Sequence, residues 1–261
     1  MFIRYNYPSN LTEYQWLFIE NIIEPNGKRK RKHCLFDIYN AILYVVKSGC
    51  QWRMLPAHFA PWNTVYFYYR KWKLEGVFEQ IHNYTVGFVR KALGRNASPS
   101  LAIIDSRSVK TSRQGGEQRG YDGGKKVKGR KHHIIVDSLG LLLAVEAHSA
   151  TPHDSKAAFS VIERLKHRFP RLKTLIADGG YRGELAENIK NSFGWALQVV
   201  LRSDTTKKFE VLPKRWIVER TISWFEGFRR LSKDYEKITE TSETMIIIAM
   251  TKIMLNKISL K

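Results

Sequence analysis

The chain has 261 residues, 43% of them hydrophobic, which is enough for one large or two small domains with a packed core. Its 44 Lys and Arg against 24 Asp and Glu give a formal net charge of +20, which favours nucleic acid as partner over a basic protein with no specific partner. The N-terminus lacks the apolar stretch of a signal peptide, and runs such as 245–250 are too short to span a bilayer. We therefore expect a soluble intracellular protein in which Cys34 and Cys50 are reduced.

The first 96 residues predict helices. Apolar periodicity and helix-start signals place them at residues 11–23, 35–47, 63–74 and 76–93. The third alternates aromatic and basic side chains, as a recognition helix of a helix-turn-helix-like module would, although ring packing in the core is the alternative. Its candidate DNA contacts are Arg70, Lys71 and Lys73. The basic run at 28–32 is equally consistent with phosphate contact and with a solvated loop.

A linker rich in Gly, Asn, Ser and Pro at residues 94–99 separates this part from a mixed pattern. The predicted order is a strand at 101–105, a hairpin at 132–147, a helix at 155–168, a strand at 172–177, a helix at 183–192, a strand at 196–201 and helices at 214–230 and 240–258. This order predicts an α/β sheet with flanking helices. We therefore divide the chain into a helical domain, 1–96, and an α/β domain, 97–261.

Two predicted buried strands end in a carboxylate, Asp105 and Asp178, and polar loops that contain or lie near glycines follow both. A third carboxylate, Glu219, lies in the predicted helix 214–230, where it can face the end of the sheet. Mg²⁺ prefers carboxylate oxygens, and two ions roughly 4 Å apart can activate the attacking oxygen and stabilise the leaving one in phosphodiester chemistry. Each acid alone would more often cap a helix or open a turn, but the three together with the positive charge predict a metal-dependent site.

Residues 106–131 carry nine Lys or Arg and two acidic residues, a local net charge of +7, together with six glycines. A flexible basic segment can follow a phosphate backbone without reading bases. The candidate DNA contacts here are Lys125, Lys126, Lys128, Arg130 and Lys131. A disordered, solvated insertion is the alternative.

Several other polar and aromatic residues receive structural interpretations. His148 and His153 are interpreted as polar loop residues, and Asp154 or Ser155 as a helix cap, in preference to a metal site. One of His132 and His133 is expected to pack inward. Two tryptophans, 216 and 224, are expected in the core, with stacking on an unpaired base as the alternative.

Long and unusual segments carry a resemblance to a known family. They are RGYDGGKKVKGRKHHIIVD (119–137), ADGGYRG (177–183) and RWIVERTISWFEGFRRLSKDYE (215–236), supported by LTEYQW (11–16), AILYVVKSGCQWRMLP (41–56), PWNTVYFYYRKW (61–72) and IDSRSVKT (104–111). Through them the chain resembles the insertion-sequence DDE transposases, specifically the single-frame branch of the fifth insertion-sequence family. The resemblance implies a ribonuclease-H-like (retroviral-integrase-like) catalytic domain after a helical DNA-binding domain, with catalytic and metal-binding roles for Asp105, Asp178 and Glu219 and two Mg²⁺ or Mn²⁺ per site.

The resemblance also implies binding of double-stranded DNA, namely the element's inverted repeats and the target, by a homodimer in the prokaryotic cytoplasm at the nucleoid. The wider family's signature Tyr-x2-Arg-x3-Glu-x6-Lys is met by Arg215 and Glu219, whereas Leu212 and Glu226 stand at the Tyr and Lys positions. The candidates for binding the terminal phosphate are therefore Arg220, Arg229 and Arg230, in that order of preference, with a solvent-facing role as the alternative for Arg220. Arg215, which fits the signature, is a further candidate DNA contact. Two rival functions are a nuclease of the same fold without strand transfer and a catalytically inactive, transposase-derived DNA-binding regulator.

Overall fold

The computed structural model describes residues 6–25, 27, 30–113, 116, 118–201 and 214–258. Its first part is helical, as predicted, with α1 (Glu13–Ile23), α2 (Leu35–Ser48), the short 3₁₀ helix η1 (Trp52–Met54), α3 (Trp62–Leu74) and α4 (Val77–Ala92). Thr12 begins α1 through a reciprocal capping box with Gln15. Thirteen residues separate α2 from α3, whereas a helix-turn-helix joins its helices by three or four. α2 and α3 are therefore not joined by the short turn of a helix-turn-helix.

The second part contains a mixed six-stranded sheet. Its strands are β1 (Leu101–Lys110), β2 (Gly120–Asp122), β3 (Val127–Asp137), β4 (Leu142–Ser149), β5 (Thr174–Asp178) and β6 (Ala196–Val200). β1 pairs antiparallel with β3 on one side and parallel with β5 on the other, and β6 continues beyond β5 in parallel. The far edge of β3 pairs with β2 near its start and with β4 along the rest. The predicted α/β sheet is thus present, and β1 lies at its centre.

β1 is twice as long as predicted and does not end at Asp105. It continues to Lys110 because β3 pairs with it from Asp137, opposite Ala102, to Gly129, opposite Lys110. Much of the basic segment 106–131 is therefore strand and not loop; residues 114, 115 and 117 within it lie outside the described residues. A short parallel bridge between Thr111 and Asp234 extends the contact towards the C-terminal part of the chain.

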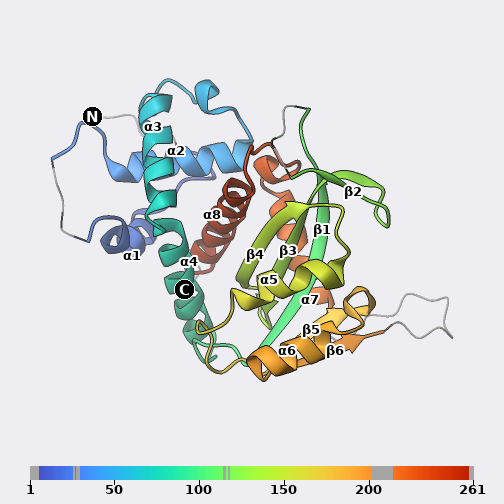
Figure 1. Cartoon of the computed structure of the whole chain (residues 1–261). Coiled ribbons are helices and arrows are strands. Elements are labelled where there is room, and N and C mark those ends of the chain that lie inside the picture. Colours follow the sequence, from blue (N-terminus) through green and yellow to red (C-terminus); the bar gives the residue numbers. More distant parts are fainter. Residues whose placement is uncertain are drawn as a thin grey trace.

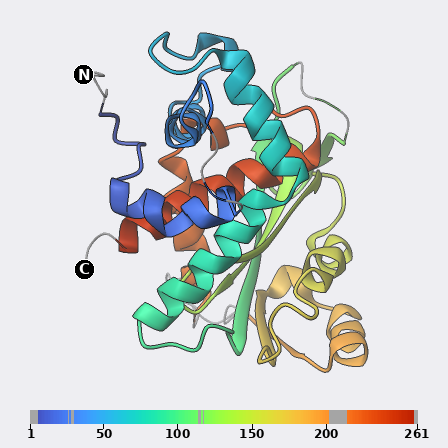
Figure 2. The ribbon, with the colours of Figure 1, turned by 90° about the vertical axis from the view of Figure 1, so that its left-hand side faces the viewer.

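Helices cover both faces of the sheet. α5 (Asp154–Glu163) and α6 (Leu185–Phe193) lie on one face, and α7 (Trp216–Glu226) lies on the other, as Figures 1 and 2 show. α7 is anchored at the β3–β4 turn, where the Thr221 hydroxyl donates to the carbonyl of Gly140 at 2.8 Å. Gly140 has φ +82°, and a Cβ there would lie 2.7 Å from the Thr221 oxygen, so the turn requires glycine.

The last helix, α8 (Thr239–Ile258), lies between the helical part and the sheet (Figure 2). It packs on β4 on one side and on α4 and α2 on the other, and most of its side chains are buried. His82 of α4 joins three of these elements, because its Nε2 donates to the carbonyl of Leu142 at 2.8 Å and its Nδ1 lies 3.3 Å from the Thr251 hydroxyl. The hydrophobic core is therefore continuous between the two parts.

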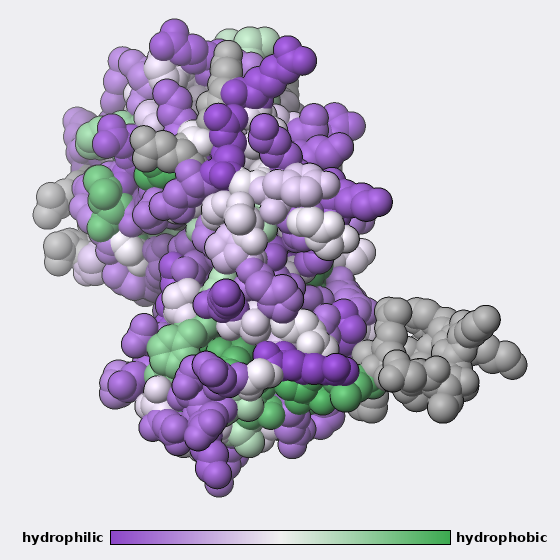
Figure 3. All heavy atoms as spheres, turned by 45° about the vertical axis from the view of Figure 1, so that its right-hand side comes forward, coloured by the Kyte–Doolittle hydropathy of each residue, from purple (hydrophilic) through white to green (hydrophobic). Residues whose placement is uncertain are grey.

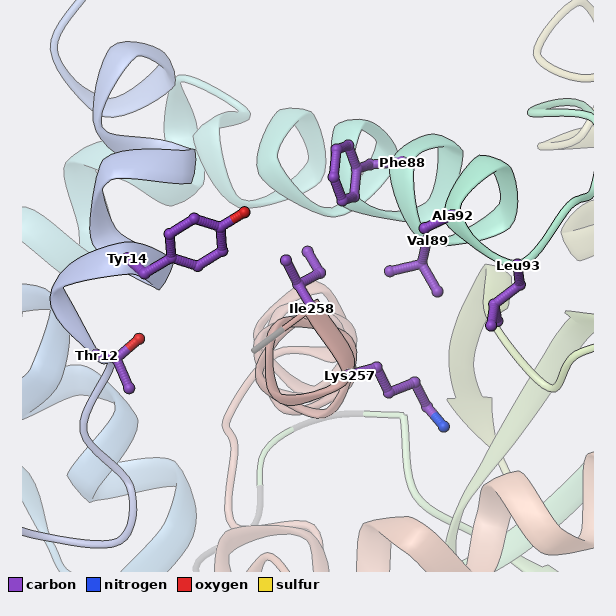
Figure 4. A pocket seen from close by; sticks show the side chains of 8 residues that line it. All are labelled: Thr12, Tyr14, Phe88, Val89, Ala92, Leu93, Lys257 and Ile258. Carbon is purple, nitrogen blue, oxygen red and sulfur yellow. The ribbon is translucent and has the colours of Figure 1, made fainter. Parts of the chain in front are cut away.

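An apolar hollow lies on the surface of the helical part. A cavity of about 740 Å³ opens between α1, α4 and α8, where Tyr14, Phe88 and Ile258 point into a common space (Figure 4). The face in Figure 3 is mainly hydrophilic, and its hydrophobic side chains gather low down, where α6 and β6 lie. Of the helices described, none is both long and apolar enough to cross a membrane.

Candidate active site

Asp105 and Asp178 lie side by side in the middle of the sheet. The parallel register of β1 and β5 places Ile103 opposite Ile176, so the residues two positions further on in each strand lie at the same level. Oδ1 of Asp105 accepts the backbone N–H of Ser106 at 2.7 Å, and Oδ1 of Asp178 accepts that of Gly180 at 2.8 Å. Asp178 thereby caps the 3₁₀ helix η2 (Gly179–Tyr181). It ends its strand as predicted, whereas Asp105 is an internal residue of β1.

Asp105 occupies an environment that disfavours its negative charge. The pKa of Asp105 is raised to about 6, mainly by burial and also by the neighbouring charge of Asp178. The Ser106 N–H and the positive charges of Arg215 and Lys125 act in the opposite direction. A partly buried carboxylate beside a second carboxylate is a place where a cation would be favoured.

Arg215 connects the pair to the third predicted acid. Its Nη2 lies 3.1 Å from Oδ2 of Asp178, and its Nε lies 3.5 Å from Oε1 of Glu219 one helical turn further along α7. The side chain of Glu219 is about half exposed. A cleft of about 370 Å³, lined by Asp178, Arg182 and Arg215, opens beside them. Asp178 and Glu219 therefore share one guanidinium, whose positive charge also acts on Asp105.

The donor atoms fit a hard divalent cation better than a soft one. Asp105, Asp178 and Glu219 supply carboxylate oxygens alone, the type that Mg²⁺ and Mn²⁺ prefer. No three His, Cys, Asp or Glu side chains in the described part of the chain are spaced as a ready-made ligand set. Asp105 and Asp178 interact electrostatically, and Glu219 is linked to Asp178 through Arg215.

Some of the predicted DNA contacts lie at the surface. Arg70 and Lys71 are exposed on α3, Lys126 and Lys128 are exposed around the β2–β3 turn, and Arg229 is exposed beyond α7. Lys125 lies next to the carboxylates, because its ammonium donates to the carbonyl and hydroxyl oxygens of Ser106 at 2.7 and 3.0 Å. These six remain available to a phosphate backbone.

Arg130 and Lys131 are not available, which corrects their prediction as DNA contacts. The Arg130 side chain is fully buried, and it donates to Asp234, to Ser242 and to the carbonyls of residues 236 and 237. The Lys131 ammonium lies 2.7 Å from Oδ1 of Asp154 and 2.9 Å from the carbonyl of Pro152. Both side chains point into the protein because β3 is covered on both faces.

Three further predicted contacts are engaged within the protein. Arg230 pairs with Glu236 at 2.7 Å, and the Lys73 ammonium donates to Thr241 at 2.9 Å. Arg220 donates to the carbonyl of Leu139, and its guanidinium lies between the rings of Trp216 and Trp224, 4.8 and 4.9 Å from their centroids. Trp216 is 45% exposed, so its predicted place in the core is wrong, whereas Trp224 packs partly against the core.

The histidine-containing segment is also placed differently. His153, and not Asp154 or Ser155, caps α5. His132 and His133 are both buried: His132 lies 3.3 Å from Asp234, and the Nδ1 of His133 lies 2.8 Å from the Nε2 of His148. His148, predicted as a loop residue, lies in β4, and both His132 and His133 pack inward where one was expected to.

Tyr181 lies beside Asp105 without having been singled out from the sequence. Its side chain is fully buried in η2, three residues after Asp178, and its ring contacts that of His133 edge to face. The sequence feature that could have indicated Tyr181 is a large aromatic residue in the otherwise glycine-rich turn ADGGYRG. Such a residue fills a specific space, because glycines on either side leave nothing else to anchor the turn.

Comparison with known proteins decides the family. Residues 96–254 match the family model described as "Transposase DDE domain", and residues 11–82 match that of "Putative transposase of IS4/5 family". The chain belongs to the DDE transposase family. A curated relative, a putative transposase for insertion sequence element IS402 from Burkholderia cepacia, is 31% identical over 117 residues, which cover 42% of this chain and 54% of the relative. The matched part thus spans about half the length of that relative.

Two solved transposase structures are distantly similar. A cryo-EM structure of the piggyBac transposase synaptic complex with hairpin DNA aligns with 98% of this chain and 67% of its own, at 10% identity and a TM-score of 0.38. The Mos1 transposase paired-end complex with left transposon end aligns with 79% of this chain and 78% of its own, at 10% identity and a TM-score of 0.25. Both scores are below 0.5, so the fold of this family member rests on its own strands and helices.

Proposed function

We propose that this chain is a DNA transposase that cuts DNA at the ends of an insertion sequence and joins those ends to a target. The observation that carries the proposal is the position of Asp105 and Asp178 at one level of neighbouring strands, with Glu219 linked to Asp178 through Arg215. Membership of the DDE family supports the same reading. We further propose that the sheet is ribonuclease-H-like, because antiparallel and parallel neighbours flank a central strand that carries the first acid.

The three carboxylates would hold two Mg²⁺ or Mn²⁺. Bound there, the ions would supply activation of an attacking oxygen and charge stabilisation of a leaving oxygen. Asp105 and Asp178 are fixed for this task by backbone N–H groups, which orient one oxygen of each side chain. Glu219, on the exposed side of α7, would complete the set when Arg215 turns from the carboxylates to a DNA phosphate.

Basic residues around the site would position the DNA. Arg215 and Lys125 are the nearest to the carboxylates, and Lys126 and Lys128 project at the adjacent turn. We propose that residues 1–96 bind the inverted repeats, with Arg70 and Lys71 on the exposed face of α3, and that residues 97–261 form the catalytic domain. Because two element ends must be joined, the active form would be a homodimer on double-stranded DNA.

The test is a cleavage and joining assay with the full chain. Labelled DNA that carries the inverted repeats flanking the gene would be incubated with a target plasmid and Mg²⁺ or Mn²⁺, using wild-type, Asp105→Asn and Glu219→Gln proteins. We expect nicks at the element boundary and joined products with the wild-type protein only. Cut products that are never joined would favour the nuclease, and end binding without any nick would favour the inactive regulator.

A further inference from the structure

The hydroxyl of Tyr181 is buried in the active-site wall, and no group in the described ranges accepts or donates a hydrogen bond there. The hydroxyl of Ser106 lies near it, but not in a hydrogen-bonding geometry, and that oxygen already accepts from Lys125 at 3.0 Å. An unsatisfied buried hydroxyl is uncommon, because removing a polar group from water without replacing its hydrogen bond is costly. The residue therefore calls for an explanation beyond packing.

The charges of three carboxylates act on this hydroxyl. Burial raises the pKa of Tyr181 well above its ordinary value, and the charges of Asp105, Asp154 and Asp178 raise it further, with that of Asp105 the largest of the three. The phenol is thus a permanent hydrogen-bond donor. A Cβ placed on Gly180, the preceding residue, would lie 3.0 Å from Oδ1 of Asp178 and 3.8 Å from Oδ2 of Asp154, which shows how closely the turn approaches both acids.

The neighbouring carboxylates accept hydrogen bonds from donors other than Tyr181. One oxygen of Asp105 accepts the Ser106 N–H at 2.7 Å, and the two oxygens of Asp178 are used by the Gly180 N–H and by Arg215. The second oxygen of Asp105 has no hydrogen bond in the described structure. The Tyr181 hydroxyl is therefore an unsatisfied buried donor, whereas the second oxygen of Asp105, a partly buried residue, accepts no hydrogen bond from the described part of the protein.

We propose that Tyr181 is a positioning residue of the metal site: its O–H donates to the Asp105 carboxylate when a divalent cation is bound and so fixes which oxygen faces the ion. This inference rests on the proposed function, because it requires Asp105 to be a metal ligand. Partners that hydrogen-bond a ligating carboxylate orient it, and losing one typically weakens metal binding about 10- to 100-fold. Tyr181 touches neither ion nor DNA in this arrangement.

Tyr69 supplies a matched control. Its hydroxyl, on α3 in the helical part, is also buried without a hydrogen bond, and the side chain is almost fully buried. Replacing either tyrosine with phenylalanine removes one oxygen and leaves the ring packing intact. Both substitutions should leave the melting temperature without added metal unchanged or higher, since each removes an unsatisfied polar group. Only the change at Tyr181 should alter metal binding.

The experiment measures Mn²⁺ binding by electron paramagnetic resonance of free Mn²⁺, and thermal unfolding with and without MnCl₂, for the full-length wild type, Tyr181→Phe, Tyr69→Phe and Asp105→Asn. We expect the Kd for Mn²⁺ to rise about 10-fold or more in Tyr181→Phe, to stay within twofold of wild type in Tyr69→Phe, and binding to be lost in Asp105→Asn. The rise in melting temperature on adding Mn²⁺ should shrink in Tyr181→Phe alone of the two tyrosine variants.

The possible contrary results distinguish an error in the role of Tyr181 from an error in the metal site. If Tyr181→Phe binds Mn²⁺ like the wild type while Asp105→Asn does not, the metal site stands and the role of Tyr181 is overturned. If Tyr181→Phe lowers the melting temperature without metal and leaves the Kd unchanged, the hydroxyl is a structural donor to Ser106, and the proposal is again overturned. If Asp105→Asn binds as tightly as the wild type, the proposed metal site itself is wrong, and this inference falls with it.

Discussion

Arg130 and Arg215 each hold an aspartate, but the two pairs lie in very different surroundings. The Arg130–Asp234 pair is fully buried, and the guanidinium also donates to Ser242 and to two carbonyls in the segment before α8. Arg215 is partly exposed and reaches Asp178 and Glu219 beside a cleft. The comparison teaches that an arginine with many internal partners holds the fold together, whereas an arginine shared between partly exposed carboxylates has fewer internal partners and, in the proposed function, exchanges them for a substrate phosphate.

The largest expected effect follows from breaking the buried pair. Arg130→Gln leaves Asp234 buried without its guanidinium, and burial alone would raise the pKa of Asp234, which His132, Ser242 and Arg130 together lower to about 2. Removing one partner of a buried ion pair typically costs about 3–5 kcal/mol. Urea unfolding should show a loss of that size, while Arg229→Gln on the exposed 3₁₀ helix η3 (Arg229–Leu231) should change stability by less than about 0.5 kcal/mol. A loss below about 1 kcal/mol for Arg130→Gln would contradict the structural role.

A second expected effect concerns His82, a buried group that stays neutral. Burial lowers the pKa of His82 to about 4, against a partly opposing hydrogen bond to the Leu142 carbonyl. Because the folded-state pKa lies below the unfolded value of about 6.5, the stability is fully present above pH 6.5 and is lost as the pH falls towards 4. The shift corresponds to roughly 3 kcal/mol in total.

Thermal or urea unfolding between pH 7 and 4 checks this effect. His82→Gln keeps an amide donor for the Leu142 carbonyl and cannot be protonated, so its stability should fall less steeply over this range. Equal losses in the two proteins would show that other groups, and not His82, control the acid sensitivity of the seam between α4, α8 and β4.

The sequence predicted most elements because their apolar periodicity is local. The four N-terminal helices, the order of strands and helices, and the position of Asp178 at a strand end all follow from spacing and turn residues. The second half of β1 did not, because Ser106 to Lys110 is polar and its strand conformation depends on pairing with β3. The local sequence pattern does not show which distant strand will pair with a segment.

The candidate site also combines features that local sequence pattern predicts with contacts between residues that are distant in the chain. Asp105, Asp178 and Glu219 were recognisable by residue type and flanking pattern, but Arg215 as their common neighbour was not. Arg130 and Lys131 were predicted as DNA contacts, yet both are buried because acids further along the chain, Asp234 and Asp154, pair with them. Charge in a sequence predicts exposure only where no distant partner is available.

The third expected effect applies the same substitution to the exposed pair. Arg215→Gln should change the free energy of unfolding by less than about 1 kcal/mol, since a partly exposed ion pair contributes little to stability. DNA cleavage should fall about 100-fold or more, because a cation that stabilises a transferring phosphate is lost. Urea unfolding and the cleavage assay measure the two quantities on one preparation. If the Arg215→Gln protein still cleaves DNA while the Asp105→Asn protein does not, Arg215 pairs with the carboxylates of the DNA-free protein and does not act on the substrate.

The smallest expected effect concerns Lys128, one of two lysines on β3 that the sequence alone did not distinguish. Lys128 is exposed, whereas Lys131 is held by Asp154. Lys128→Ala should weaken binding to any duplex DNA by a few fold and should reduce the slope of log affinity against log salt by about 1, because one phosphate contact is removed. Lys190→Ala on the exposed side of α6 is the control and should leave that slope unchanged. Fluorescence anisotropy at several salt concentrations measures both. An equal drop in slope for the two variants would mean that overall net charge, and not a track along the β2–β3 turn, attracts the DNA.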